Sequence, residues 1–130
     1  MEIVIDTSAL IAVIVDEPER GKIIEITKGG RLVGPGSIPW EIGNAFSAMY
    51  KQKRITHREL QKALAIYNDI PIRFIPTDFI EALHFAEQVE IYAYDAYFIE
   101  CAIKRRAPLL TLDRKLKNTA MQFDIEVLEV

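Results

Sequence analysis

Short runs rich in β-branched residues alternate along this chain with longer stretches of helical periodicity. The runs predict five strands, at Glu2–Ile5, 31–33, Ile72–Ile75, 109–112 and 125–129. Between them, apolar residues at helical spacing predict helices at 9–15, around Ile23 to Ile26, after Ser37 through Tyr50, and at 56–68, 78–89, 95–105 and 114–119. This alternation favours an α/β fold with a mainly parallel central sheet of about five short strands and helices on both faces.

Hydroxyl-bearing residues mark where several of these helices begin. Ser8 can cap the first helix, and Ser37 can cap the third. Thr56 and Glu59 form a capping-box signature at the start of the fourth. We expect these side chains to accept hydrogen bonds from the first turns of their helices.

The length and composition limit the organisation of the chain. A chain of 130 residues, half of them apolar, can bury one core, so residues 1–130 are expected to form a single domain. The apolar runs are far shorter than the ~20 residues that a bilayer span needs, and no basic segment precedes an apolar stretch at the start. The one cysteine, Cys101, has no partner for a disulfide and is expected in the core. We expect a cytoplasmic protein that does not enter membranes.

The charge balance excludes one class of nucleic-acid-binding protein. A formal net charge of −3 argues against a protein that coats nucleic acid by bulk electrostatics, because that requires surplus Lys and Arg. Contact with nucleic acid must therefore be local. Three basic clusters are candidates, at Lys51, Lys53 and Arg54, at Lys104, Arg105 and Arg106, and at Arg114, Lys115 and Lys117. Each cluster is also explained as a solvated helix end.

Four acidic residues, scattered along the sequence, are expected to meet at one edge of the sheet. Asp6 and Asp113 directly follow predicted strands, and the carboxyl ends of parallel strands form the reactive crevice in this class of fold. Asp95 opens a helix, and Glu41 lies one turn inside another. Asn44 shares a helix face with Glu41. All of these side chains can point into the same crevice.

Each acid also has an ordinary explanation, as a strand end, a helix cap or a first-turn glutamate. Their convergence favours a shared function, because four carboxylates in one crevice raise each other's pKa unless a cation lies among them. Hard oxygen ligands without a Cys or His cluster indicate Mg²⁺ or Mn²⁺, and such an ion can assist phosphodiester hydrolysis. Thr7, Ser8 and Thr111 lie beside the acids and either support them or serve caps and turns.

Four stretches together carry a family resemblance. They are Val4-Ile5-Asp6-Thr7-Ser8-Ala9-Leu10, Glu41 with Asn44, Tyr94-Asp95-Ala96-Tyr97, and Thr111-Leu112-Asp113. In this order and spacing they resemble the PIN-domain ribonucleases and, among these, the VapC-type toxins of prokaryotic toxin–antitoxin pairs. The likeness spans nearly the whole chain, and no acid of the family pattern is missing.

The resemblance implies a PIN-like fold and a toxin that acts as an endoribonuclease. Such an enzyme uses Mg²⁺ or Mn²⁺ to cleave RNA, often transfer or ribosomal RNA, and leaves a 3′-hydroxyl and a 5′-phosphate. The resemblance implies that the catalytic and metal-binding acids are Asp6, Glu41, Asp95 and Asp113. It assigns supporting roles to Thr7, Ser8, Asn44 and Thr111. It also implies two partners, a second copy in a homodimer and a VapB-type antitoxin.

An apolar groove is expected to receive a segment of the antitoxin. We predict that it runs towards the acids and is lined by Leu10, Ile14, Ile23, Trp40 and Phe46. An amphipathic segment in this groove would place an Arg or Lys among the acids and block the site. Trp40 is thus expected in the core or at an interface rather than as a platform for a base.

Other readings compete with the toxin. The acids fit equally well a PIN-domain nuclease of RNA maturation, and a non-catalytic regulatory module can retain the same fold. A phosphorylated receiver domain or a phosphatase fits less well, because no second acid lies two residues after Asp6. His57 and His84 lie on different helices and are expected at the surface or in the core. Tyr94 and Tyr97, with Tyr92, either stack on unpaired bases or form a partly buried cluster at a helix edge.

Overall fold

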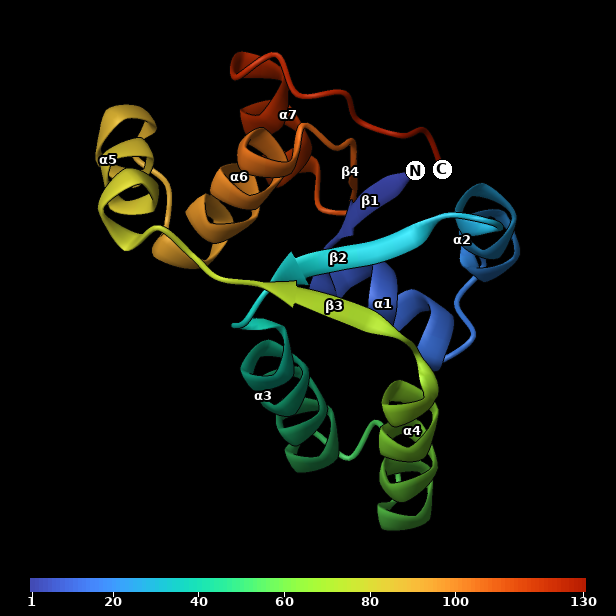
Figure 1. Ribbon diagram of the computed structural model, residues 1–130. Helices are drawn as coiled ribbons and strands as arrows, with labels where there is room; N and C mark the ends of the chain where they lie inside the picture. Colours follow the sequence, from blue (N-terminus) through green and yellow to red (C-terminus); the bar gives the residue numbers. More distant parts are fainter.

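Four strands and seven helices make up the computed structural model, which describes residues 1–130 (Figure 1). The strands are β1 (Glu2–Ile5), β2 (Arg31–Pro35), β3 (Ile72–Ile75) and β4 (Leu109–Leu110). The helices are α1 (Thr7–Ile14), α2 (Arg20–Thr27), α3 (Ile38–Lys51), α4 (His57–Asp69), α5 (Phe79–Val89), α6 (Ala93–Arg105) and α7 (Arg114–Gln122). No helix combines the length and the apolar character that crossing a membrane requires.

The sheet is entirely parallel, with the strand order β3-β2-β1-β4. Ile3, Val4 and Ile5 of the inner strand β1 are all buried. Since successive side chains of a strand point to opposite faces, both faces of β1 must be covered. Helix α6 packs against β1 and β2, whereas α1 packs against α2, α3 and α4. The predicted α/β class with a parallel sheet is therefore confirmed.

The prediction of a fifth strand at 125–129 is wrong. Only Val127 bridges to the sheet, opposite Leu109. The bridge consists of hydrogen bonds from Leu109 N to Glu126 O and from Leu128 N to Leu109 O, both 2.9 Å long. The strand beside this segment is β4, which spans two residues rather than the predicted 109–112. An apolar run forms a ladder only where its partner strand is long enough, and β4 is not.

Two helix starts distinguish a wrong cap assignment from a correct one. Asp6, rather than Ser8, caps α1, because its Oδ1 accepts a hydrogen bond from Ala9 N at 3.1 Å. Ser8 instead donates to Asp6 Oδ1 at 2.7 Å. Asp and Ser are equally good caps, so only the end of β1 decides between them. In α4 the predicted capping box is confirmed, with both hydrogen bonds between Thr56 and Glu59 present.

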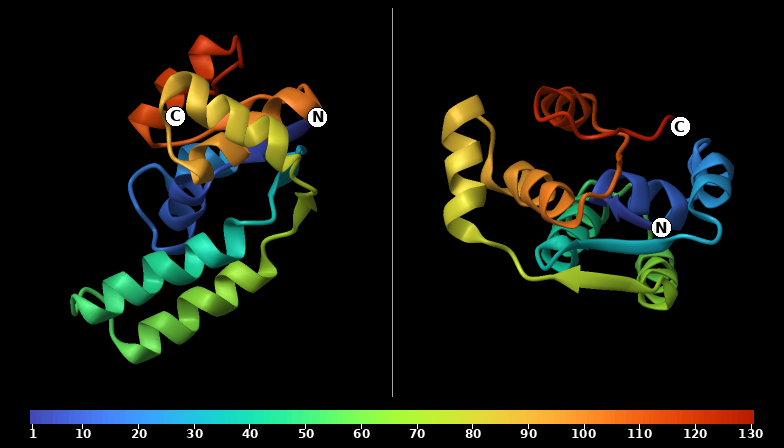
Figure 2. Two further views of the ribbon diagram at one scale, coloured as in Figure 1. Left: turned by 90° about the vertical axis from the view of Figure 1, so that its left-hand side faces the viewer. Right: turned by 45° about the horizontal axis from the view of Figure 1, so that its top comes forward.

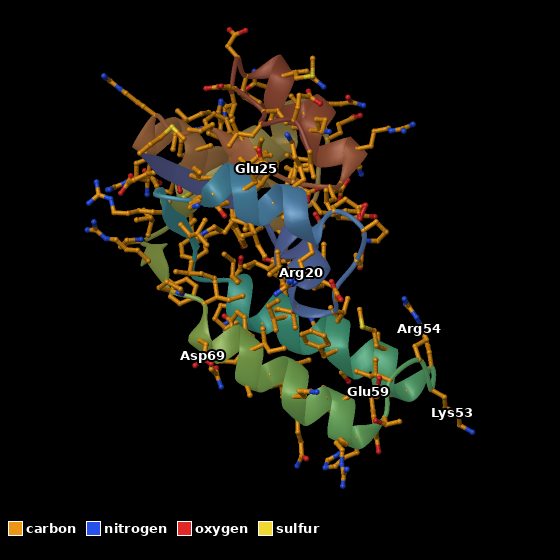
Figure 3. The ribbon with its side chains drawn as sticks, turned by 90° about the vertical axis from the view of Figure 1, so that its right-hand side faces the viewer. Arg20, Glu25, Lys53, Arg54, Glu59 and Asp69 are labelled. Carbon is orange, nitrogen blue, oxygen red and sulfur yellow. The ribbon has the colours of Figure 1, made fainter.

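Helices α3 and α4 pack side by side as a hairpin that projects from the sheet (Figure 2). Lys53 and Arg54 lie at its tip (Figure 3). Glu41 lies at the other end of α3 from Lys51, about 15 Å away along the helix axis. The first of the three basic clusters is therefore remote from the predicted acids.

Two residues of the second basic cluster, Lys104 and Arg105, form ion pairs at the end of α6. Arg105 donates to both carboxylate oxygens of Glu2, at 2.8 and 2.6 Å, which ties the end of α6 to the start of β1. Lys104 pairs at 2.9 Å with Glu100, a buried acid that also accepts a hydrogen bond from Asp78 N at 3.3 Å. These two cations hold the scaffold and are not free for phosphate.

Alanine substitutions at two glycines are expected to change the stability of the fold in opposite directions. Gly34 lies in β2, where an added Cβ overlaps the side chain of the buried Ile38, so Gly34→Ala is expected to lower stability by about 1–3 kcal/mol. Gly43 lies on the exposed side of α3 with open space around an added Cβ, so Gly43→Ala should raise stability by about 0.5–1 kcal/mol. Urea unfolding measures both changes. A Gly34→Ala protein as stable as wild type contradicts the packing at Ile38.

Candidate active site

Asp6 stands at the carboxyl end of β1 and is only 5% exposed. Its Oδ1 accepts hydrogen bonds from the Ser8 hydroxyl at 2.7 Å and from Ala9 N at 3.1 Å. Its Oδ2 accepts from the Thr111 hydroxyl at 2.6 Å. Since these donors belong to α1 and to the residue that follows β4, the carboxylate joins three elements of the fold.

The buried position of Asp6 changes its acidity. Burial raises its pKa from the ordinary 3.8 to about 6, because a carboxylate loses hydration when it is removed from water. The hydrogen bonds from Thr111, Ser8 and Ala9 act in the opposite direction, and the negative charge of Asp113 adds to the rise. A carboxyl group with so perturbed a pKa is typical of functional sites.

Glu41 lies in the first turn of α3 and is held at both oxygens. Its Oε2 accepts a hydrogen bond from the Ser37 hydroxyl at 2.8 Å, and its Oε1 accepts from the Thr7 hydroxyl at 3.2 Å. Burial raises its pKa, and the negative charges of Asp6 and Asp95 raise it further. Through Thr7, the first residue of α1, Glu41 is tied to the segment that directly follows Asp6.

Asp95 and Asp113 are both placed by helix starts. Asp95 lies in the first turn of α6, where burial raises its pKa, the charge of Asp113 raises it further and Lys115 opposes the rise. Asp113 caps α7, since its Oδ1 accepts from the backbone N–H groups of Lys115 at 2.8 Å and Leu116 at 3.2 Å. Its own N–H donates to the Thr111 hydroxyl at 3.0 Å. Asp113 therefore has a structural role in addition to its charge.

The four acids act on one another as a ring of like charges. Asp113 raises the pKa of both Asp6 and Asp95, and these two raise the pKa of Glu41. None of the four takes part in either ion pair of the chain. The fold thus brings acids from four separate stretches of sequence to one place, where the positive charge of Lys115 acts on Asp95.

The donor chemistry of this ring suits a hard divalent cation, although its present spacing is wider than shared coordination requires. No three carboxyl, imidazole or thiol groups of the chain are placed to hold one metal ion together. Asp6 and Asp113 meanwhile direct oxygens to hydroxyl and backbone donors. Oxygen ligands and raised pKa values among crowded carboxylates fit Mg²⁺ or Mn²⁺. Shared coordination by these acids requires their side chains to move inward.

Three of the four predicted supporting residues bond to the acids, namely Thr7, Ser8 and Thr111. Asn44, by contrast, is exposed and makes no hydrogen bond with an acid. Ser37 occupies the N-cap position of α3 as predicted, but the expected capping hydrogen bond to its side chain is absent. Its hydroxyl donates to Glu41 instead, a partnership that the cap assignment overlooked. The available signal was the spacing of four residues, which places the two side chains on one helix face. Nothing in the sequence distinguished Lys115 from the other basic residues near it.

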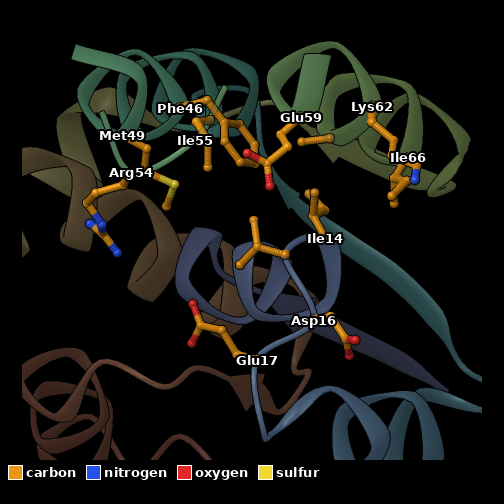
Figure 4. A pocket seen from close by; sticks show the side chains of 12 residues that line it. Ile14, Asp16, Glu17, Phe46, Met49, Arg54, Ile55, Glu59, Lys62 and Ile66 are labelled. Carbon is orange, nitrogen blue, oxygen red and sulfur yellow. The ribbon is translucent and has the colours of Figure 1, made fainter. Parts of the chain in front are cut away.

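The apolar groove differs from the predicted one. Leu10 and Ile23 are each 1% exposed and belong to the core, so they line no surface. A cavity of about 470 Å³ lies instead between the C-terminal end of α1 and the α3–α4 hairpin, with Ile14, Phe46 and Ile66 among its walls (Figure 4). Because the acids lie at the N-terminal end of α1, this groove does not run towards them as predicted.

Four residues outside the predicted site, the cysteine, the two histidines and the tryptophan, can be compared with their expected places in the core or at the surface. Cys101 is buried in the core as predicted, and burial raises the pKa of its thiol to about 12. His57 and His84 are exposed, in agreement with surface placement. Trp40 is 72% exposed, which excludes the core and leaves its predicted place at an interface as a prediction. Trp40 lies in the first turn of the amphipathic helix α3, whose buried residues are Ile38, Ile42 and Phe46.

Solved structures with the same fold come from several prokaryotes. PAE2754 from Pyrobaculum aerophilum superposes with a TM-score of 0.67 at 23% identity, covering 92% of this chain and 79% of that one. VapBC2 from Rickettsia felis, bound to a DNA fragment from its promoter, gives 0.66 at 17% identity, with 98% of both chains covered. VapC20 from Mycobacterium tuberculosis, a sarcin–ricin loop cleaving toxin, gives 0.63 at 17% identity over 89% of this chain and 93% of that one.

Sequence comparison agrees with the fold. None of the curated proteins compared with the chain matches it. The family model described as the PIN domain, however, matches residues 3–121, a span that contains all four acids. The chain therefore belongs to the PIN domain family.

Proposed function

We propose that this protein is a metal-dependent endoribonuclease that acts as the toxin of a type II toxin–antitoxin system. The observation that carries the proposal is the ring of four carboxylates at the carboxyl edge of the sheet, none of which has an ion-pair partner. Three of them, Asp6, Glu41 and Asp95, have raised pKa values. Membership of the PIN domain family supports it. So does the similarity in fold to VapC20, a toxin that cleaves the sarcin–ricin loop.

In this proposal the acids hold Mg²⁺ or Mn²⁺, and the residues around them fix their positions. A bound divalent ion would polarise the phosphodiester and lower the pKa of a bound water. Thr111 and Ser8 orient the carboxylate of Asp6, while Ser37 and Thr7 orient that of Glu41. Water attacks phosphorus and the bond to O3′ breaks, so the products carry a 3′-hydroxyl and a 5′-phosphate.

Two other functions are weighed against this one. A non-catalytic regulatory module has no need of four acids, yet all four are present and three are held by hydrogen bonds. A nuclease of RNA maturation uses the same acids, so the site does not separate it from a toxin. The toxin is favoured by the solved structures of similar fold, which include VapBC2 and a toxin–antitoxin complex from Klebsiella pneumoniae.

The proposal includes an antitoxin partner that anchors in the groove of Figure 4. Apolar side chains form its walls, and charged residues such as Asp16, Glu17, Arg54 and Lys62 surround them. An amphipathic helix binds such a groove through its apolar face. A second copy of the chain in a homodimer is also proposed, and Ile80 on α5, 86% exposed, is a candidate for that contact.

The first prediction concerns the acids. Asp6→Asn and Asp95→Asn should each abolish RNA cleavage in Mg²⁺, because the amide lacks the charge that holds the ion. Asp69→Asn, at the exposed end of α4 (Figure 3), is the matched control and should cleave at the wild-type rate. EDTA should stop the wild type, and Mn²⁺ should restore it. Circular dichroism verifies the fold of each variant, and cleavage by a folded Asp95→Asn protein at the wild-type rate refutes the assignment.

The second prediction concerns pH and the metal-free protein. Because the fold raises the pKa of Asp6 from 3.8 to about 6, its protonation favours folding. This contribution is fully present below about pH 4 and is lost as pH rises through about 6, by about 3 kcal/mol in total. Relative to wild type, Asp6→Asn should therefore gain about that much stability between pH 4 and pH 8. Urea unfolding in EDTA measures the difference, and a difference that does not vary with pH contradicts it.

The third prediction concerns the groove. Ile66 and Leu64 lie on α4 with similar exposure, 39% and 37%, but only Ile66 lines the groove. Ile66→Glu should weaken the complex with the protein encoded by the adjacent gene, whereas Leu64→Glu should not. RNA cleavage by either variant alone should equal that of wild type, because the groove is remote from the acids. Co-purification tests the binding, and equal retention of both variants places the partner elsewhere.

A further inference from the structure

A second cleft, rich in aromatic residues, opens beside the acids. We call it the aromatic cleft, and its volume is about 340 Å³. Its main walls are Ser37, Trp40, Thr77, Phe79, Tyr94 and Tyr97. None of these residues belongs to the ring of carboxylates, and none lines the groove between α1 and the α3–α4 hairpin. The cleft therefore needs an explanation of its own.

The position of the cleft follows from the strand order. Ser37 comes just after β2 and Thr77 just after β3, while Asp6 follows β1 and Asp113 follows β4. The strand order is β3-β2-β1-β4 (Figure 1). From these positions along the chain, the cleft and the acids share the carboxyl edge of the sheet. They are displaced by about two strand spacings, or about 10 Å. A ligand that reaches the acids along this edge passes the cleft.

The rings of the cleft are arranged around open space. Tyr97 makes edge-to-face contacts with Phe79, at 5.6 Å between centroids, and with Tyr94, at 5.8 Å. These contacts fix the rings relative to one another. Phe79 is nevertheless 59% exposed and Trp40 is 72% exposed. The cleft therefore offers fixed aromatic surface to a planar group from outside the chain.

The cleft is joined directly to the proposed active site. The hydroxyl of Ser37, one of its walls, donates to Glu41 at 2.8 Å. Tyr94 directly precedes Asp95 on α6. On the other side of the acids, Lys115 acts on Asp95 and lies 5.1 Å from the centre of the Tyr92 ring. A strand of nucleic acid across the edge thus meets a cation, the acids and then the aromatic rings.

We propose that the aromatic cleft binds an unpaired base of single-stranded RNA, next to the phosphodiester held at the acids. This inference rests on the proposed nuclease function and adds to it a base-binding subsite in the aromatic cleft. Aromatic side chains beside a backbone-binding site are how proteins hold single-stranded nucleic acid, because every base has a face that stacks. Ser37 and Thr77 supply hydroxyl groups that can bond to the edge of the base. A base that is paired in a duplex is stacked already and cannot enter.

The rival occupant is a second copy of this chain. The strongest apolar candidate for such a contact is Ile80, the next residue to Phe79, which is 86% exposed and does not line the cleft. The cleft itself carries hydroxyl groups, one of which, on Ser37, donates to Glu41, and this suits a polar ligand better than an apolar surface. Substitutions at the adjacent residues Phe79 and Ile80 can therefore distinguish a bound base from a second copy of the chain.

Steady-state cleavage of a short unstructured RNA provides the main test. Phe79→Ala and Trp40→Ala should raise KM roughly tenfold to a hundredfold, which is the usual loss for one stacked base, with kcat close to wild type. Tyr50→Ala, at the far end of the same helix as Trp40, and Ile80→Asp are the matched controls and should leave KM unchanged. A KM for Phe79→Ala equal to that of Tyr50→Ala overturns the proposal.

Trp40 also provides a direct signal, because it is the one tryptophan of the chain. Its fluorescence should change when wild-type protein in Mg²⁺ is mixed rapidly with a single-stranded hexanucleotide. The change should be absent with the same sequence in a duplex or with an abasic hexanucleotide. Fluorescence that does not respond to the single strand, or responds equally to all three RNAs, overturns base binding.

The two readouts separate this inference from the proposed function. If wild type cleaves no RNA, the nuclease proposal fails, while the fluorescence still reports whether a base enters the cleft. If wild type cleaves RNA but neither KM nor fluorescence responds as stated, only the cleft assignment fails. If Phe79→Ala turns a dimer into a monomer by sedimentation and Ile80→Asp reproduces its rise in KM, the occupant is a second copy and base binding is overturned.

Discussion

The hydrogen bonds of the buried Asp6 carboxylate are the constraint on which this structure depends. They bring β1, the first turn of α1 and the residue after β4 to a single point, and they do so with a group whose charge burial disfavours. The same side chain caps a helix and stands at the centre of the proposed site. The capping role of Asp6 and its proposed role at the active site therefore both follow from its position at the end of β1. Asp113 repeats the pattern at α7, where the cap of a helix is also part of the ring of acids.

Sequence patterns predicted what depends on neighbours along the chain. The rule that functional side chains follow parallel strands located Asp6 and Asp113, and the period of apolar residues located the helices. Patterns were less informative where a distant element decides the outcome. The segment 125–129 reads as a strand, but the short β4 gives it only one bridge. Leu10 and Ile23 lie on apolar faces, yet the sequence does not say which faces other helices cover.

The strand order divides one edge of the sheet into two chemically different halves. β1 and β4 lead into Asp6 and Asp113, whereas β2 and β3 lead into the segments that carry the exposed rings of Trp40 and Phe79. No stretch of sequence contains this division, because the rings come from α3, α5 and α6 and meet only when the sheet forms. Ser37 is the residue that belongs to both halves, since it lines the cleft and donates to Glu41. Its role becomes visible only once the order of strands is known.

Helix α3 is shared by the acids and the groove. It carries Glu41 in its first turn and presents Phe46 and Met49 to the groove between α1 and the hairpin. A helix is stiff over this length, so a ligand that shifts α3 at one end shifts Glu41 at the other. In the proposed complex with a divalent ion, thermodynamic linkage acts in both directions: the factor by which a groove ligand changes the affinity for the ion is the factor by which the ion changes the affinity for that ligand. Because α3 connects the two sites, ligand binding in the groove is expected to change the affinity at the acids, and binding at the acids is expected to change the affinity of the groove.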